Sequence, residues 1–268
     1  MNRRTEEEKA KAPALFASHI VGPIRSRRLG LSLGVNLLPT DGKVCTFDCL
    51  YCECGWGRDH RGGHLPQGDD VVAQLEAKLC AMHAAGEAPD VITFAGNGEP
   101  TVHPDFPRVV EATLALRDRY CPAARVSVLS NATRIGDEAV RRALMSVDNN
   151  ILKLDAGTDA TARLIDRPAA ADYSLRRVVE EMKRFDGRLT VQTMFVRGEH
   201  NGLVVDNTTA AEVEAWRALV REVAPAEVMV YSLDRPTPER NLRKVPRADL
   251  EAIAAPLVAE GFKVQVTG

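Results

Sequence analysis

Short apolar stretches alternate with longer amphipathic ones along most of the chain, and this alternation is the feature that most limits its fold. A short apolar run between turn residues predicts a strand, and an apolar stripe at helical spacing predicts a helix. The predicted strands are residues 31–38, 91–95, 125–129, 151–154, 189–196, 227–233 and 262–266. The predicted helices are residues 69–86, 104–120, 136–145, 174–185, 209–223 and 247–260, the last kinked or shortened by Pro256.

The order of these elements favours an α/β protein with a parallel sheet covered by helices. Right-handed connections curl six or seven such units into a barrel, and eight are needed to close one. We therefore predict a partial (β/α)6 barrel with the helices outside. Residues 1–22 are expected to form a polar lead-in with a short helix at 6–16, and residues 23–268 a single core domain that ends in a helix and a strand.

Composition places the chain in the ordinary globular range, with 45% apolar and 27% charged residues. A formal charge of −2 gives no overall basic field that would attract nucleic acid or anionic lipid. The N-terminus is charged and lacks the apolar stretch of a secretory signal, and no apolar run reaches the length of a membrane span. Six cysteines in 268 residues, three of them crowded, do not form a disulfide pattern, so we expect the reducing cytosol.

The crowded cysteines are Cys45, Cys49 and Cys52, which follow the first predicted strand with C-x3-C-x2-C spacing. Three thiolates from one short loop can converge on a soft metal site. On a four-iron cluster they would leave one iron without a protein ligand, free to bind a small molecule. The alternative is a structural zinc site with Cys54 as a fourth thiolate, although C-x-C is tighter than the usual zinc pairs.

Other polar features follow successive predicted strands. The segment 96–100 follows the second strand, Ser130 and Asn131 follow the third, and Asp155 follows the fourth. In a barrel of parallel strands, the loops after the carboxyl ends gather on one face, so these features should meet the cysteines there. Lys153 and Asp155 alternate with leucines and share one side of their strand.

The cysteine spacing, with Tyr51 just before the third cysteine, resembles the cluster loop of the radical S-adenosylmethionine (SAM) superfamily. The resemblance implies one [4Fe-4S] cluster held by Cys45, Cys49 and Cys52. It implies SAM on the fourth iron, with the Tyr51 ring near the adenine. Residues 94–100 resemble the "GGE" segment of that superfamily, which presents acceptors to the SAM amino group. The residues expected there are Gly96, Asn97, Gly98 and Glu99, with Asn97 in place of a glycine.

Further SAM contacts are expected around this segment. If Lys153 and Asp155 face the lumen, the carboxylate can bind the ribose hydroxyls and the ammonium the SAM carboxylate. Ser130, Asn131 and Gln192 are further candidates. Each group also has a structural alternative. Residues 96–100 could be a tight turn that caps the next helix, and Lys153 and Asp155 a buried ion pair. Ser130 and Asn131 could belong to an ordinary strand-to-helix turn. The substrate candidates are His103, Arg134, Met194 and Tyr231.

Three longer stretches resemble a bacterial group related to the tRNA wyosine-base synthases. They are the stretch beginning Gly22-Pro-Ile-Arg-Ser-Arg-Arg, then Lys153-Leu-Asp-Ala-Gly, and Tyr231-Ser-Leu-Asp-Arg-Pro. The resemblance covers about residues 20–240. Those synthases use a second cluster held by extra N-terminal cysteines, and this sequence has no cysteine before Cys45. The resemblance therefore implies the superfamily's chemistry and not that substrate.

The expected function is reductive cleavage of SAM to a 5′-deoxyadenosyl radical, which takes hydrogen from a small molecule, a nucleoside or an RNA base. A one-electron reductant such as flavodoxin or ferredoxin is the expected partner, and no membrane is involved. Two alternatives stay open at this point. One is an activating enzyme or maturase that acts on a peptide or protein partner, and the other is a zinc-stapled fold without catalysis.

Overall fold

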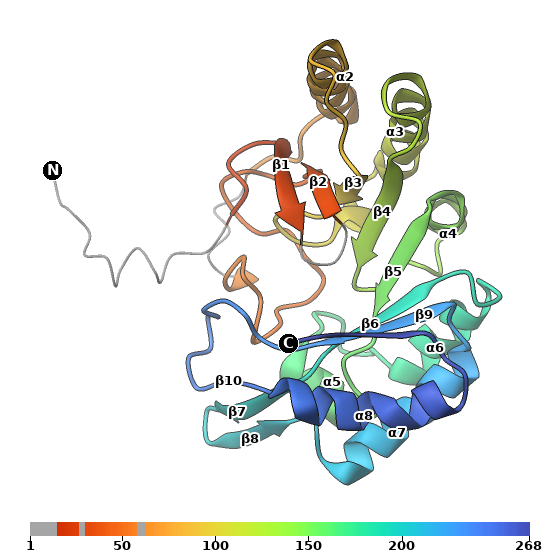
Figure 1. Cartoon of the computed structure of the whole chain (residues 1–268). Coiled ribbons are helices and arrows are strands. Elements are labelled where there is room, and N and C mark those ends of the chain that lie inside the picture. Colours follow the sequence, from red (N-terminus) through yellow and green to blue (C-terminus); the bar gives the residue numbers. More distant parts are fainter. Residues whose placement is uncertain (1–14, 27–29, 58–62) are drawn as a thin grey trace, which may run out of the picture.

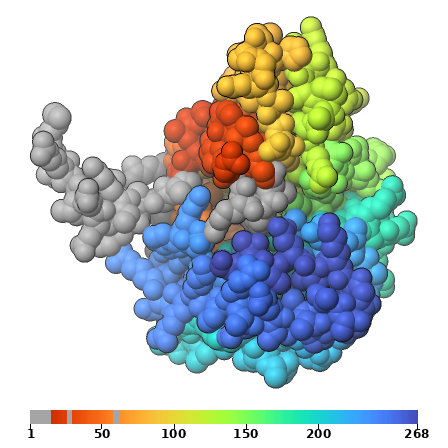
Figure 2. All heavy atoms as spheres, viewed as in Figure 1, coloured from red at the N-terminus to blue at the C-terminus, as the bar shows by residue number. Residues whose placement is uncertain are grey.

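The computed structural model of the chain describes residues 15–26, 30–57 and 63–268 (Figures 1 and 2). Its main feature is an eight-stranded sheet in the order β1-β2-β3-β4-β5-β6-β9-β11. All neighbouring strands in it run parallel except β1, which pairs antiparallel with β2. The strands are β1 (Ile20–Ser26), β2 (Gly30–Val35), β3 (Val91–Phe94), β4 (Arg125–Ser130), β5 (Asn149–Lys153), β6 (Thr190–Met194), β9 (Glu227–Tyr231) and β11 (Val264–Thr267).

Helices connect these strands and lie along the outside of the sheet (Figure 1). They are α2 (Gly68–Ala84), the short 3-10 helix η2 (Pro100–Val102), α3 (Phe106–Tyr120), α4 (Glu138–Ser146), α5 (Asp159–Ile165), α6 (Leu175–Lys183), α7 (Ala210–Val223) and α8 (Arg247–Ala259). The sheet order follows the chain order from β2 to β6, as right-handed βα units require. The predicted partial (β/α) barrel is confirmed.

The core lies between the sheet and the helices because each helix buries one apolar stripe against the strands. Aromatic pairs mark this layer: Phe94 meets Phe106 edge-on at 6.0 Å, and Phe195 meets Trp216 at 5.2 Å between ring centres. The Trp216 indole N–H donates to the Leu154 carbonyl at 3.1 Å, so the buried ring leaves no polar atom unpaired. Burial of each large apolar side chain stabilises the fold by about 1.5–3 kcal/mol.

A second, small sheet in the order β10-β7-β8 projects beyond the end of the barrel (Figure 1). It consists of β7 (Val196–His200), β8 (Leu203–Asp206) and β10 (Arg243–Lys244), and the sequence patterns did not predict it. Asn207 ties it to the main sheet: its side-chain amide donates to the carbonyls of Asp155 and Met194, both at 2.8 Å. Its oxygen accepts from the Val196 N–H at 2.8 Å.

Three further expectations need correction or remain open. The predicted lead-in is wrong from Ile20 onward, where β1 begins, and most of the helix expected at 6–16 lies outside the described residues. Pro256 sits inside α8 without ending it. The carbonyl of Ala252, which a proline four residues later leaves free, accepts from the Arg217 guanidinium at 3.4 Å. The single domain at 23–268 stays a prediction.

No helix in the described part of the chain combines the length and the apolar character needed to cross a bilayer.

Candidate functional site

The cysteine segment lies between β2 and α2, and its first residues pair with the turn after β3. The Val44 N–H donates to the Asn97 carbonyl at 2.9 Å, and the Glu99 N–H donates to the Val44 carbonyl at 3.0 Å. Gly98 makes this approach possible because its φ is +136° and a Cβ there would lie 1.8 Å from the Val44 oxygen. The glycine turn therefore lies directly against the cysteine segment.

A second segment, residues 165–169 after α5, supports the cysteine segment from the other side. The N–H groups of Asp48 and Leu50 donate to the carbonyls of Asp166 and Ile165 at 3.0 and 2.9 Å. The Ala169 N–H donates to the Thr46 carbonyl at 2.9 Å. We call residues 165–169 the strap. Its backbone bonds fix the path on which the thiols are presented.

One pocket at the carboxyl ends of the strands collects most of the predicted residues. Its lining is Cys45, Phe47, Cys49, Tyr51, Cys52, Cys54, Ala95, Gly96, Gly98, Glu99, Leu129, Ser130, Asn131, Lys153 and Gln192. Every residue predicted to hold the cluster or SAM lines it except Asn97 and Asp155. Segments far apart in the sequence thus meet on the face where a barrel concentrates its chemistry.

Glu99 connects the glycine turn to the end of β4. Its carboxylate accepts from the Ser130 hydroxyl at 2.9 Å and from the Asn131 N–H at 2.6 Å. It also accepts from the Thr101 N–H at 3.1 Å as the cap of η2, so the predicted capping alternative describes part of its role. Burial raises the pKa of Glu99, although these hydrogen bonds act in the opposite direction.

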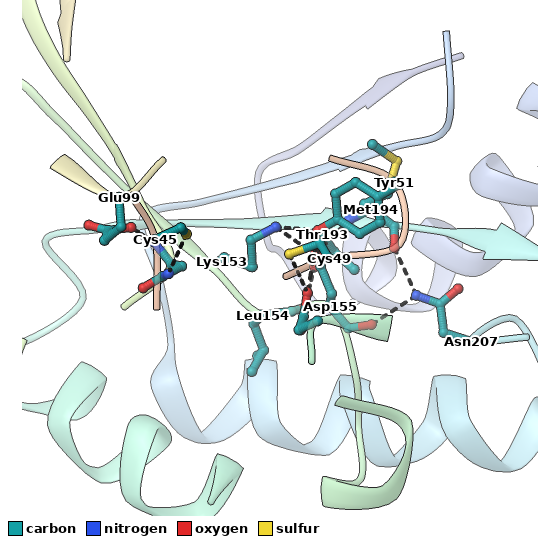
Figure 3. Close-up of polar contacts among 12 residues, drawn as sticks. Cys45, Cys49, Tyr51, Glu99, Lys153, Leu154, Asp155, Thr193, Met194 and Asn207 are labelled. Carbon is teal, nitrogen blue, oxygen red and sulfur yellow. Dashed lines mark hydrogen bonds and ion pairs between the residues drawn. The ribbon is translucent and has the colours of Figure 1, made fainter. Parts of the chain in front are cut away.

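Lys153, Asp155 and Tyr51 form a buried polar group on the other side of the pocket (Figure 3). The Lys153 ammonium lies 3.0 Å from the Asp155 carboxylate and also contacts the Tyr51 hydroxyl, which donates to Asp155. The second Asp155 oxygen accepts from the Met194 N–H at 2.8 Å. Lys153 therefore faces the pocket while Asp155 lies behind it. Burial lowers the pKa of Lys153. The Asp155 carboxylate and the other nearby negative groups raise it by more, so the net shift of the pKa is upward.

The three thiols have different surroundings. Burial raises the pKa of Cys45 to about 11 and raises that of Cys49, whose sulfur lies 3.4 Å from an Asp166 oxygen. A hydrogen bond with Cys54 lowers the pKa of Cys52 to about 6. The Asn131 amide lies 3.6 Å from the Cys45 sulfur as a donor. Among the described residues, no three Cys, His, Asp or Glu side chains converge closely enough for a single metal ion.

Lys43 is a member of this site that the sequence reasoning missed. Its ammonium lies 3.0 Å from the carboxylate of Asp48, which stands between the first two cysteines, and 3.1 Å from the Gly55 carbonyl after the last one. Asp166 was missed as well, because it follows α5, which the sequence patterns did not predict. A lysine two residues before a cysteine matches no sequence motif for a buried charge, so the burial of Lys43 is seen only in the structure.

Besides Asp155, Met194 and Tyr231, three predicted residues lie outside the pocket lining. The Asn97 side chain turns toward the N-terminal segment, where it donates to the Pro39 and Phe16 carbonyls. His103 is buried with both ring nitrogens occupied: one contacts the Pro66 carbonyl at 2.8 Å, and the other accepts from the Asp105 N–H at 3.0 Å. Arg134 is half-exposed beside Asp137. Their predicted roles have no support in this geometry.

Met194 and Tyr231 are paired in register across β6 and β9 and line a neighbouring cavity. That cavity also contains Glu53, the residue after Cys52. Gln192 lies two residues before Met194 on β6 and lines the cysteine pocket. The two substrate candidates on these strands therefore lie at the edge of the predicted SAM site.

Comparison with known proteins places this geometry in a family. The model of the radical SAM superfamily matches residues 40–206. A UPF0026 protein of Synechocystis is 30% identical over 82% of this chain and 77% of its own length. A UPF0026 protein of Helicobacter pylori is 26% identical over 81% of this chain and 67% of its own.

Two solved structures share the fold at lower identity. A radical SAM methyltransferase from Sphaerobacter thermophilus matches with a TM-score of 0.67 and 18% identity, over 88% of this chain and 65% of that one. A structure of TYW1 with a lysine-pyruvate adduct bound matches with a TM-score of 0.59 and 15% identity, over 86% of this chain and 74% of that one. The chain belongs to the radical SAM superfamily and, within it, to the UPF0026 proteins.

Proposed function

We propose that this radical SAM enzyme holds one [4Fe-4S] cluster on Cys45, Cys49 and Cys52, binds SAM beside it, and acts on a small-molecule or nucleoside substrate. The observation that carries the proposal is the shared pocket. Three thiols of the cysteine segment, a buried carboxylate after β3 and an ammonium at the end of β5 line one cavity at the carboxyl ends of the strands. None of these segments needs the other two as neighbours for its own local structure, so their meeting in one pocket supports a shared function.

The donor set fits the proposed groups. Three thiolates suit iron and sulfide, and on a four-iron cluster they would leave one iron free for SAM. The glycine turn contributes backbone carbonyls and Glu99, which are acceptors for an ammonium group. Lys153 contributes an ammonium for a carboxylate. A zinc-stapled fold gives no reason for Glu99 and Lys153 to line the same pocket as the thiols, and superfamily membership argues against it.

When bound, the cluster and SAM would supply the radical chemistry, which is one-electron reductive cleavage of SAM and abstraction of hydrogen from the substrate. The chain's own contribution is positioning. Cys49 and Tyr51 are held through the strap, and Glu99 is fixed by Ser130, Asn131 and Thr101. The apolar side chains of Phe47 and Leu129 line the pocket and limit the access of water.

Two further parts of the proposal concern the surroundings. Radical SAM enzymes generally need an external electron donor, and we propose a flavodoxin or ferredoxin for this chain. Free thiols at Cys45, Cys49 and Cys52 suit a reducing compartment, so we propose that the enzyme works in the cytosol.

The test is anaerobic reconstitution with iron and sulfide, followed by addition of dithionite and SAM. The expected result is release of 5′-deoxyadenosine by the wild-type chain and by Cys80→Ala, whose cysteine is exposed on α2. Cys49→Ala should release none. Absence of the product from fully reconstituted wild-type chain, or equal amounts from Cys49→Ala, would contradict the proposal.

A further inference from the structure

The segment from Ser232 to Leu242 joins β9 to β10 and carries most of the Tyr231-Ser-Leu-Asp-Arg-Pro motif. Neither the cluster nor the SAM site uses these residues. The segment leaves the carboxyl end of a barrel strand, the end from which substrate-binding loops normally extend. From this position we infer that the segment borders the entrance to the barrel lumen.

Basic side chains of this segment and of β10 line a cavity of about 440 Å³. Arg235, Arg240 and Lys244 line it, and Asp234 is the one acidic side chain among its described lining residues. Arg235 is ion-paired to Glu53, and Lys244 lies 3.6 Å from Asp234. For Arg240, no ion pair is recorded with any of the residues that the structure describes. We call this cavity the basic pocket.

The basic pocket continues toward the SAM site. Asp234 and Lys244 also line the neighbouring cavity that contains Met194, Tyr231 and Glu53. Met194 is two residues from Gln192 on β6, and Glu53 is adjacent to Cys52. The basic pocket and the neighbouring cavity thus share two lining residues, and the neighbouring cavity adjoins the cysteine pocket along β6 and along the cysteine segment.

Several contacts hold the segment in place against the cysteine loop. The Arg235 guanidinium lies 2.6 Å from the Glu53 carboxylate, and the Glu239 N–H donates to the Leu50 carbonyl at 3.3 Å. The Ser232 hydroxyl donates to the Phe195 carbonyl at 2.7 Å and accepts from the Val245 N–H at 2.8 Å. The basic pocket is therefore fixed relative to the site of hydrogen abstraction.

We propose that the basic pocket binds a phosphate group of the substrate, so that the substrate's reacting carbon extends past Tyr231 toward SAM. Arginine and lysine together supply the directed and the mobile donors that phosphate oxygens accept. The chain as a whole carries a net charge of −2, which suits one phosphate on a small molecule better than a polyanion. This inference rests on the proposed function, because it presumes that the reaction takes place above the cysteines.

Equilibrium dialysis with radiolabelled inorganic phosphate, in low-salt buffer free of other multivalent anions, tests the inference. Wild-type chain should bind phosphate saturably with a Kd of about 1 mM or tighter. Arg240→Gln should weaken binding about tenfold, the loss expected for one charge-assisted contact. Arg142→Gln, which changes an exposed arginine on α4, is the matched control and should bind like wild type.

A measurement without substitutions guards against misfolded variants. Phosphate should protect Arg235 and Arg240, but not Arg142, from phenylglyoxal, as read by peptide mass spectrometry. Equal affinity in Arg240→Gln and wild type, or no protection, would overturn the inference. Tight binding of a single-stranded RNA that inorganic phosphate does not displace, with a steep salt dependence, would overturn it in favour of RNA. None of these assays needs the cluster or SAM, so 5′-deoxyadenosine release reports on the proposed function separately.

Discussion

The Lys43 ammonium lies 3.0 Å from the Asp48 carboxylate, and both side chains belong to the segment that carries the three thiols. Lys43 is only 4% exposed. Burial lowers its pKa, but the charges of Cys52, Cys49 and Cys45 and the bond to Asp48 raise it, so the net shift is well upward. A buried positive charge therefore remains beside the three cysteine sulfurs at neutral pH.

Lys43→Met should make the cluster harder to reduce, because loss of a nearby positive charge disfavours the added electron. The expected midpoint potential is more negative by roughly 60 mV or more, the shift for a tenfold change in a one-electron equilibrium. A redox titration followed by electron paramagnetic resonance measures it. Lys183→Met on the surface of α6 is the control, and Asp48→Asn should shift the potential the opposite way. An unchanged potential at equal iron content would contradict this role.

Single cysteine substitutions should show which thiols are cluster ligands and whether Cys54 is one of them. Cys45→Ala, Cys49→Ala and Cys52→Ala should each lose most of the iron and sulfide after reconstitution, because a three-thiolate site has no spare ligand. Cys54→Ala should keep both, and Cys80→Ala serves as the control. Iron and sulfide analysis decides the matter. Loss of iron from Cys54→Ala alongside the others would indicate four protein ligands and rule out an open iron.

Lys153→Met should weaken SAM binding by about ten- to a hundredfold, the range for loss of one hydrogen bond to a charged group. Lys153 faces the pocket while its partner Asp155 lies behind it, so the ammonium is the group within reach of a ligand. Equilibrium dialysis of SAM against protein of equal iron content measures the effect. Lys263→Met, at an exposed position, should bind SAM like wild type. Equal affinity in Lys153→Met would remove Lys153 from the SAM site.

Asn207→Ala should lower the free energy of unfolding by about 3 kcal/mol or more. The amide is 1% exposed and bonds to three backbone groups, those of Asp155 after β5, Met194 in β6 and Val196 in β7. These groups would lose their partner, at about 1–3 kcal/mol each. Urea denaturation measures the change. Gln74→Ala, at an exposed position of α2, should change the same quantity by no more than about 0.5 kcal/mol. A similarly small change in Asn207→Ala would show that the small sheet does not depend on this amide.

Glu239→Gln should reduce stability in a pH-dependent way. Burial raises the pKa of Glu239, but the bonds from His200 at 2.6 Å and from the Asn241 N–H lower it, with a net downward shift. A folded-state pKa below the unfolded value stabilises the fold above the unfolded pKa, and this contribution is lost as the pH falls through the folded one. The difference in unfolding free energy between wild type and Glu239→Gln should therefore be largest near pH 7 and shrink below about pH 4. Glu251→Gln on α8 is the control, and a difference that does not vary with pH would contradict the assignment.

The main sheet and its helices were predictable from sequence because each buries a regular apolar pattern. Strands were expected to begin at Arg125 and Glu227, and β4 and β9 begin there. The end of α3 at Tyr120 was also expected. Most of the pocket lining followed from the rule that loops after parallel strands gather on one face.

The remaining features depend on contacts that no local pattern records. The hairpin of β7 and β8 exposes Leu203 and Val204, so it lacks the apolar alternation of a buried strand. The burial of Lys43 depends on its contacts with Asp48 and the Gly55 carbonyl. The position of that carbonyl cannot be predicted from the glycine-rich sequence around it. Asn97 looked like a ligand contact because it stands in a glycine motif, but its amide is used by the Pro39 carbonyl 58 positions away.

The strap holds the cysteine segment mainly through main-chain groups: the N–H groups of Asp48, Leu50 and Ala169 and the carbonyls opposite them. The Asp166 side chain adds contacts to Cys49 and Tyr51. Every amino acid has a carbonyl, and every one except proline has an N–H. Evolution can therefore replace most side chains along residues 165–169 without moving the sulfurs, provided that the backbone keeps its course. A proline at position 48 or 50 is the exception, because one missing hydrogen there would detach the loop from its support.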